Sequence, residues 1–251
     1  LDEKGMIYAE IRFAPQQHMK CGLSQHEVVE AAVEGLNRAK KDYPDMTAQL
    51  INCMMHKGAD AHTNWEANLE TIRVTKEFLG KGVVALDLAG YENNGDFMLY
   101  APLFEIAREQ GIPYTIHAGE MGDGSHVPMA IGMGAYRIGH GINCVHDPAW
   151  LAEVVEKQIP LEVCVTGNTI GMFNRKYCDH PIRQLLEAGV KVTINTDNMT
   201  FSETDLINEY AQLRALGVSM DTLKRCAQNS IDAAFCSEET KEMLRKKMGF
   251  K

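Results

Sequence analysis

The sequence predicts an α/β fold with a parallel sheet, and three observations lead to this expectation. The 251 residues are 45% hydrophobic, which is enough for a sizeable core. Short runs rich in Val, Ile and Leu alternate with segments of helical periodicity along the whole chain. No apolar stretch approaches the roughly 20 residues that a membrane span needs. Strict alternation of strand and helix favours parallel strands joined by helical crossovers.

The predicted strands are short and mostly apolar. Residues 6–13 are rich in Ile, Tyr and Phe, and residues 83–88 read VVALDL, which is typical of a strand buried on both faces. The predicted strands, in chain order, are Met6–Phe13, Ala48–Met54, Val83–Leu88, Ile112–Ile116, Arg137–Ile142, Pro160–Val165 and Val190–Asn195.

Helical segments lie between most of these strands. Ser24 with Glu27 three residues later has the pattern of a capping box at a helix start. Pro181 opens a later helix, where its missing N–H does no harm. The predicted helices are Ser24–Lys41, Trp65–Leu79, Leu103–Glu109, Ala130–Ala135, Ala149–Lys157 and Pro181–Ala188, with further helical pieces after Glu203.

Two architectures fit this alternation: an open doubly wound sheet and a closed (β/α)₈ barrel. No GxGxxG fingerprint follows the first strand, which disfavours a dinucleotide-binding open sheet. A barrel needs one strand more than the sequence contains, and the chain begins LDEKGMIYAEIRFAP without an initiator Met. We therefore expect residues 1–251 to form a single (β/α)₈ barrel domain that lacks its first strand at the N-terminus.

Charge and cysteine content exclude several classes of protein. The net charge of −9 argues against a surface that follows nucleic-acid phosphates. The seven cysteines are scattered and form no CxxC pair, so neither a disulfide framework nor a cysteine zinc site is indicated. We expect a cytoplasmic protein that binds neither nucleic acid nor membrane, and the sequence assigns no oligomeric state.

Polar residues follow the strands, at the ends where barrel enzymes carry their chemistry. Each has a structural explanation when taken alone. A strand-end histidine is commonly a hydrogen-bonded structural residue, Asp197 with Asn198 could form a capping turn, and Gly90 could be a loop glycine. The whole series nevertheless indicates a site. Its members are His117, Glu120, His140, Thr166, Asn168, Asp197 and Asn198, whereas we expect His56 and Asp87 to be structural or to support these residues.

These residue types suit metal-assisted hydrolysis. His117 and Asp197 are the kinds of ligand that zinc accepts, and zinc lowers the pKa of a bound water to about 7. Glu120 could pass a proton to a substrate nitrogen, and His140 could orient or deprotonate the attacking water. No GxSxG elbow is present, which argues against a serine triad.

Three motifs in this order resemble the adenosine deaminase family, and in particular its bacterial branch. They are HAGE at 117–120, RIGHGI at 137–142 and TINTDN at 193–198. Further similarity lies in MIYAEIRFAP at 6–15, VVALDLAGYE at 83–92 and EVCVTGN at 162–168, so the resemblance covers essentially the whole chain.

The resemblance implies a (β/α)₈ barrel with one zinc ion that converts adenosine or deoxyadenosine to inosine and ammonia in purine salvage. A small purine nucleoside would then be the partner of the site. By residue, the resemblance implies zinc ligation by His117 and Asp197, protonation of purine N1 by Glu120, positioning and activation of water by His140 with Asp197, and purine binding by the Gly90 N–H and Asn198.

The chain departs from the family pattern in two places. Many members carry aspartate at the position of Asn198, but an asparagine amide can donate to purine N7 without first being protonated. The HxH motif of the family's first strand, which supplies two more zinc ligands, is absent, and we expect it upstream of Leu1. Zinc held by His117 and Asp197 alone would be poorly fixed.

Other functions remain open at this point. The chain could deaminate adenine or another aminopurine, or it could be an inactive deaminase-like protein that acts by binding. Cytidine-type deaminases are disfavoured because their HxE and PCxxC pair is absent.

Overall fold

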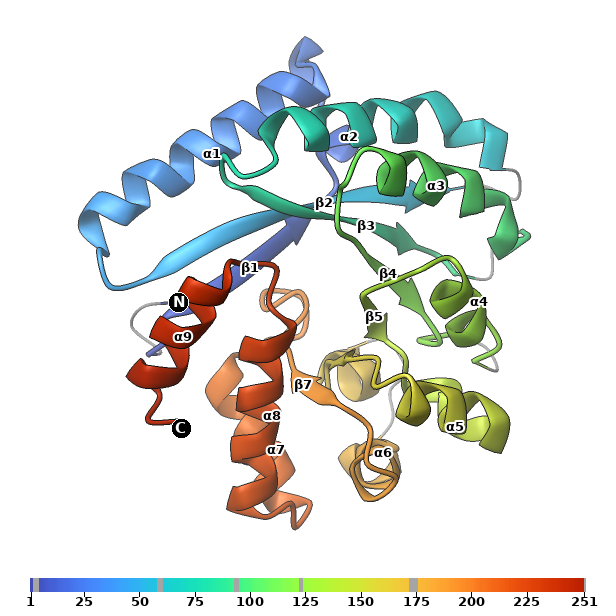
Figure 1. The fold of residues 1–251 in the computed structure, drawn as a ribbon, viewed down its shortest axis with the longest axis vertical. Helices are drawn as coiled ribbons and strands as arrows, with labels where there is room; N and C mark the ends of the chain where they lie inside the picture. Colours follow the sequence, from blue (N-terminus) through green and yellow to red (C-terminus); the bar gives the residue numbers. More distant parts are fainter. Residues whose placement is uncertain (2–4, 58–60, 93–94, 122–123, 172–175, 251) are drawn as a thin grey trace. The chain divides into compact units, whose positions relative to one another are not determined.

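The computed structural model describes residues 1, 5–57, 61–92, 95–121, 124–171 and 176–250. These residues fall into two compact units (Figure 1). The first unit is Leu1–Ile116 with Phe235–Ser237, and the second is His117–Ala234 with Glu238–Lys251. Each unit is described by itself.

The strands of the described residues form two sheets, with the orders β1-β2-β3 and β4-β5-β6-β7 (Figure 1). Strand β2 pairs in parallel with β1 and β3, and β6 pairs in parallel with β5 and β7. The strands are β1 (Tyr8–Phe13), β2 (Thr47–His56), β3 (Val83–Gly90), β4 (Thr115–Ala118), β5 (Arg137–His140), β6 (Leu161–Val163) and β7 (Val192–Ile194).

Helices separate most of the strands, as the sequence predicts. No helix of the described residues is long and apolar enough to cross a membrane. The α-helices are α1 (Gln25–Asp42), α2 (Trp65–Phe78), α3 (Ala101–Glu109), α4 (His126–Gly132), α5 (Pro148–Glu156), α6 (Ile182–Glu187), α7 (Leu206–Ala215), α8 (Met220–Ala233) and α9 (Glu238–Lys247).

The core of the first unit forms where α1 and α2 pack on the β1-β2-β3 sheet (Figure 1). β-Branched and apolar side chains from both helices and from two strands are buried together there, because their removal from water is the main favourable term in folding. The buried members are Val29, Val33, Leu50, Val74 and Val83.

Helix α1 begins with the expected capping box. The Glu27 N–H donates to Ser24 Oγ over 3.2 Å, and the Ser24 N–H donates to the Glu27 carboxylate over 2.8 Å. The hydrogen bonds from Ser24 lower the pKa of Glu27, because they favour its charged form.

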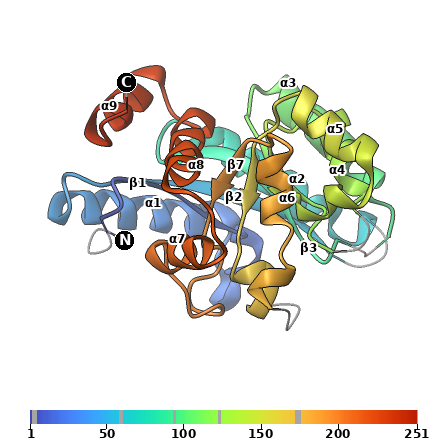
Figure 2. The same cartoon turned by 90° about the horizontal axis from the view of Figure 1, so that it is seen from below.

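In the second unit, parallel pairing aligns the carboxyl ends of the strands. Ile138 pairs with Leu161, and Val163 pairs with Ile194. The Asn195 N–H donates to the Val163 carbonyl over 2.9 Å and extends this ladder past β7. Helices α7 and α8 pack against β7 (Figure 2). The residues that follow β5, β6 and β7 therefore leave one edge of the sheet together.

Most elements lie within two residues of the sequence-based bounds, but two begin three or four residues away. The helix expected at 130–135 lies instead at 126–132, because Pro128 falls in its first turn, where the missing N–H would have no partner anyway. The strand expected at 112–116 lies at 115–118. Pro113 has no N–H to donate, and the regular strand begins two residues after it.

Gly90 ends β3 in a conformation that excludes other residues. Its φ is +125°, and a Cβ at this position would lie 2.6 Å from the His56 carbonyl oxygen of the paired strand. A side chain at position 90 would therefore force two backbones apart.

We expect Gly90→Ala to lower the free energy of unfolding by about 2 kcal/mol or more, because it combines a strained φ with a backbone clash. The matched control is Gly35→Ala in α1, where a Cβ would meet no described atom within 4 Å. The control should raise stability by about 0.5–1 kcal/mol, because alanine favours helix. Urea denaturation measures both, and equal stability of the two variants would contradict this account.

Candidate active site

Two histidines at neighbouring strand ends lie in ring contact. His117 is in β4 and His140 ends β5, and their ring centroids are 4.9 Å apart at an angle of 64°. Gly139 makes this approach possible, because a Cβ there would lie 3.0 Å from His117 Nδ1. The strand order of the second sheet therefore places both imidazoles at one edge.

Glu120 joins this pair from the loop after β4. Its side chain is only 11% exposed, and its Oε2 lies 3.5 Å from His140 Nε2. The side-chain amide of Asn143 donates to the Glu120 carbonyl over 3.0 Å and fixes the main chain at this point. A carboxyl group held in a nearly dry position beside an imidazole is suited to proton transfer.

Asn168 connects these groups, although the sequence suggested no specific role for it. Its Oδ1 accepts the Cys164 N–H over 3.2 Å, which fixes the orientation of the amide. Its Nδ2 therefore faces Glu120 Oε1 at 3.2 Å and His140 Nδ1 at 3.0 Å. Because an amide nitrogen can only donate, His140 Nδ1 must accept, and the proton of the neutral ring is on Nε2.

Strained backbone occurs at two of the predicted site residues. His140 has φ +61° and Asp197 has φ +55°, both in the left-handed region that is uncommon for residues with a side chain. Such strain persists only where surrounding contacts fix it, and it is frequent at functional sites. In the described residues, the other non-glycine residues with positive φ are Cys21, Gln158 and Glu203.

Asp197 follows β7 and lies beside the segment that carries Asn168. A Cβ built on Gly167 would lie 3.6 Å from Asp197 Oδ2, so the carboxylate sits directly over this glycine. Within the described part of the chain, the Asp197 carboxylate accepts no hydrogen bond. Its oxygens are available to a cation or to a substrate.

Asn198 and Gly90 complete the predicted set. Asn198 is exposed, and its Oδ1 accepts the Phe201 N–H over 3.0 Å, so the capping turn that the sequence offered as an alternative is present. The amide nitrogen of Asn198 is then the group left to meet a ligand. Gly90 is exposed at the end of β3 and belongs to the first unit.

The side chains of His117 and Asp197 are of the types that bind zinc. Imidazole and carboxylate are ordinary zinc ligands, and catalytic zinc takes three protein ligands. Within residues that the structure describes, no three His, Cys, Asp or Glu side chains group closely enough to hold a metal ion. Burial raises the pKa of the Cys144 thiol, in the segment after β5, to about 12, so this thiol is protonated at neutral pH.

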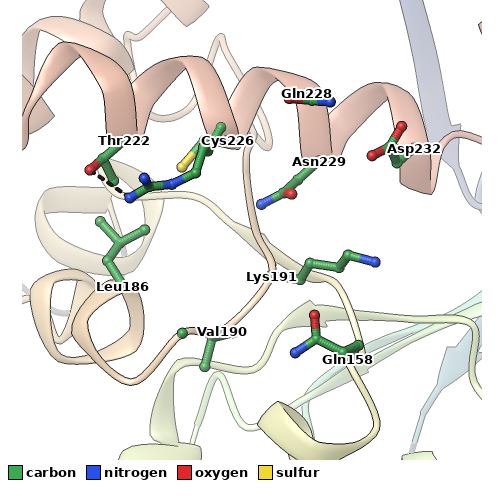
Figure 3. A pocket seen from close by; sticks show the side chains of 11 residues that line it. Gln158, Leu186, Val190, Lys191, Thr222, Cys226, Gln228, Asn229 and Asp232 are labelled. Atoms are coloured by element: carbon green, nitrogen blue, oxygen red, sulfur yellow. Dashed lines mark hydrogen bonds between the residues drawn. The ribbon is translucent and has the colours of Figure 1, made fainter. Parts of the chain in front are cut away.

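A separate cavity of about 320 Å³ lies at the opposite ends of the strands (Figure 3). Gln158 and Lys191, which precede β6 and β7, face Asn229 and Asp232 of α8 across it. In barrel enzymes the amino ends of the strands serve stability, whereas the chemistry is at the carboxyl ends. This cavity is therefore not the candidate active site.

Comparison with known proteins gives consistent matches. The family model for adenosine deaminase matches residues 1–249. An adenosine deaminase of Haemophilus ducreyi is 41% identical over 248 residues, which are 97% of this chain and 71% of that protein.

Solved structures match over a similar share. An adenine deaminase from Arthrobacter aurescens superposes with a TM-score of 0.84 at 26% identity, covering 96% of this chain and 72% of that chain. An N6-methyl-AMP deaminase from Arabidopsis thaliana has a TM-score of 0.81 at 26% identity, covering 95% and 71%. These matches therefore define a hydrolase of the α/β TIM-barrel class.

Within this class, the chain belongs to the adenosine deaminase family. This confirms both the family resemblance and the fold class that the sequence predicts. The roles of the individual site residues stay predictions.

The Asn168 amide generates a prediction about the His140 ring. We expect ¹⁵N chemical shifts of a histidine-labelled sample at pH 8 to show an unprotonated Nδ1 and a protonated Nε2 for His140. In Asn168→Leu, which removes the donor to Nδ1, this preference should weaken. A protonated Nδ1 in the unaltered protein would contradict the assigned orientation of the amide.

Proposed function

We propose that this protein hydrolyses the 6-amino group of adenosine or deoxyadenosine, giving the inosine product and ammonia. The observation that carries the proposal is the buried contact set in which the Asn168 amide bridges Glu120 and His140, beside His117, in a chain 41% identical to an adenosine deaminase. This reaction serves purine salvage.

Glu120 is the proton donor to N1 of the purine. Its carboxyl group is nearly buried and is held from two sides, by Asn168 at Oε1 and by His140 near Oε2. A proton placed on N1 draws electrons from C6, which makes this carbon open to attack by water. The amino group takes one proton of the attacking water and leaves as ammonia when the C6–N bond breaks. The remaining hydroxyl proton returns to Glu120 as the C6 carbonyl forms.

His140 and Asp197 act on the attacking water. Because His140 Nδ1 accepts from Asn168, its Nε2 carries the proton, so this ring donates a hydrogen bond and orients the water rather than taking a proton from it. In this proposal the Asp197 carboxylate takes the proton as the water oxygen bonds to C6.

The proposal includes one zinc ion, with His117 and Asp197 as two of its protein ligands. A zinc ion held there would lower the pKa of a water molecule to about 7, which would make the nucleophile available at neutral pH. The imidazole and carboxylate of these residues match the ligand types that zinc prefers, and Asp197 Oδ2 lies beside Gly167, which has no side chain of its own.

Asn198 provides recognition of the purine ring. Since the Phe201 N–H occupies its Oδ1, its amide nitrogen is the atom that can donate to N7. The backbone N–H of Gly90 as a second purine contact stays a prediction. A single barrel domain over residues 1–251 and a cytoplasmic location are likewise part of the proposal.

Adenine is the second candidate substrate. The structural similarity to an adenine deaminase, at a TM-score of 0.84, favours it. Adenosine has a ribose and adenine does not, so contacts to the ribose would determine which of the two is the substrate. Turnover of adenosine and of adenine by the product of the complete reading frame distinguishes the two possibilities.

We expect Glu120→Gln to lower kcat for adenosine by about 10²–10⁴-fold, because glutamine cannot deliver a proton to N1. The matched control is Glu187→Gln on α6, an exposed carboxylate that faces Arg183, and it should keep full activity. The absorbance change on conversion of adenosine to inosine measures both variants.

Two results would contradict the proposal. Full activity of Glu120→Gln would remove the proton donor from its role. An unaltered protein that binds no zinc and turns over neither adenosine nor adenine would instead be an inactive protein that acts by binding.

A further inference from the structure

Asn168 sits in a short buried loop, residues 164–169, that follows β6. The loop is closed on itself by the Asn168 N–H, which donates to the Cys164 carbonyl over 2.8 Å, and by Thr169 Oγ1, which donates to the Val165 carbonyl over 2.7 Å. These bonds set the shape of the loop. These two hydrogen bonds do not fix the position of the loop relative to the rest of the second unit.

A carboxylate from another element fixes this position. Glu209, in the first turn of α7, is fully buried. Its Oε2 accepts the Thr166 N–H over 3.1 Å, and its Oε1 accepts the Thr204 hydroxyl over 2.7 Å. Thr166 is two residues from Asn168, so Glu209 ties the loop to α7.

This carboxylate has an unusual environment. In the described part of the chain its partners are the two neutral donors of Thr166 and Thr204, and no arginine or lysine pairs with it. A buried carboxylate without a cation is costly, and the amino end of α7 offsets only part of this cost. An apolar side chain would fill the space at less cost but would give the Thr166 N–H no acceptor.

We propose that Glu209 is a positioning residue for deamination. By holding Thr166 and Thr204, it fixes the loop 164–169 and so keeps the Asn168 amide against Glu120 and His140. This inference rests on the proposed function for its kinetic effect, whereas the placement of Asn168 can be measured without turnover.

The variants follow from the hydrogen bonds. Glu209→Leu keeps the approximate size but leaves the Thr166 N–H buried without an acceptor. Glu209→Gln keeps one oxygen for this N–H, and its NH₂ can donate to Thr204 Oγ1. The Thr204 hydroxyl can then turn to Thr166 Oγ1, which lies 3.4 Å away. Glutamine should therefore rescue what leucine loses.

For the product of the complete reading frame with zinc, we expect Glu209→Leu to lower kcat for adenosine by 10-fold or more. KM should change by less than about 3-fold, because neither Glu209 nor Asn168 has a proposed contact with the substrate. Glu209→Gln should stay within about 3-fold of the unaltered kcat.

A double-mutant cycle tests whether Glu209 acts through Asn168. In an Asn168→Ala background, Glu209→Leu should lower kcat by less than about 2-fold, because the group that it positions is already absent. Equal effects of Glu209→Leu in both backgrounds would overturn the inference.

A matched control separates positioning from stability. Asp232→Asn on α8 removes a carboxylate that accepts from Arg245 over 2.6 Å and has no bond to the loop 164–169. It should lower Tm while leaving kcat unchanged. A similar loss of kcat in this control would show that the kinetic effect reports stability alone, and this would overturn the inference.

The side-chain NH₂ resonances of Asn168 give a readout that needs no activity. They should shift in Glu209→Leu, return in Glu209→Gln and stay in place in Asp232→Asn. Unshifted resonances in a folded Glu209→Leu would overturn the inference. An inactive unaltered protein would instead contradict the proposed function, and these resonances would still test the positioning. If Glu209→Leu fails to fold, Thr204→Val, which removes one of the two donors, should give a smaller shift in the same direction.

Discussion

The in-register pairing of β5, β6 and β7 is the constraint on which the candidate site depends. Main-chain hydrogen bonds align the three strands, and the bond from Asn195 N–H to the Val163 carbonyl continues the alignment beyond β7. Because parallel strands end at the same edge, residues that are far apart in the sequence leave the sheet side by side. His140, Asn168 and Asp197 come from three such ends.

The second level of organisation is a set of polar contacts that are nearly closed to water. The Asn168 amide accepts from the main chain on one side and donates to Glu120 and His140 on the other. Buried polar groups need such partners, and each bond in a dry environment is stronger than it would be in water. The cluster therefore holds its geometry before a substrate arrives, which is what transition-state stabilisation requires.

Much of this arrangement could be predicted from the sequence. Apolar runs between helical segments gave the order of strands and helices, and the HAGE, RIGHGI and TINTDN motifs gave the family and the candidate site residues, whose roles stay predictions. The bounds of α4 were wrong because Pro128, which ends helices in their interior, is tolerated in a first turn. The local sequence pattern does not show whether Pro128 lies in the first turn of a helix or in its interior.

The roles of Asn168 and Glu209 could not be predicted, for a different reason. An asparagine after a strand is ordinary turn chemistry, and only the bond from Cys164 N–H shows which way its amide points. Glu209 lies 43 residues from Thr166, in the first turn of α7, and it is the only acidic residue of this helix. Its role depends on tertiary contacts, which a sequence pattern does not contain.

The most direct test is the distance between His117 and Asp197 in an experimental structure of the product of the complete reading frame, crystallised with zinc. If both residues bind one ion through bonds near 2 Å, a ring nitrogen of His117 and a carboxylate oxygen of Asp197 should lie within about 4 Å of each other. A separation beyond about 8 Å would contradict a shared metal ion, and with it the proposed deamination chemistry.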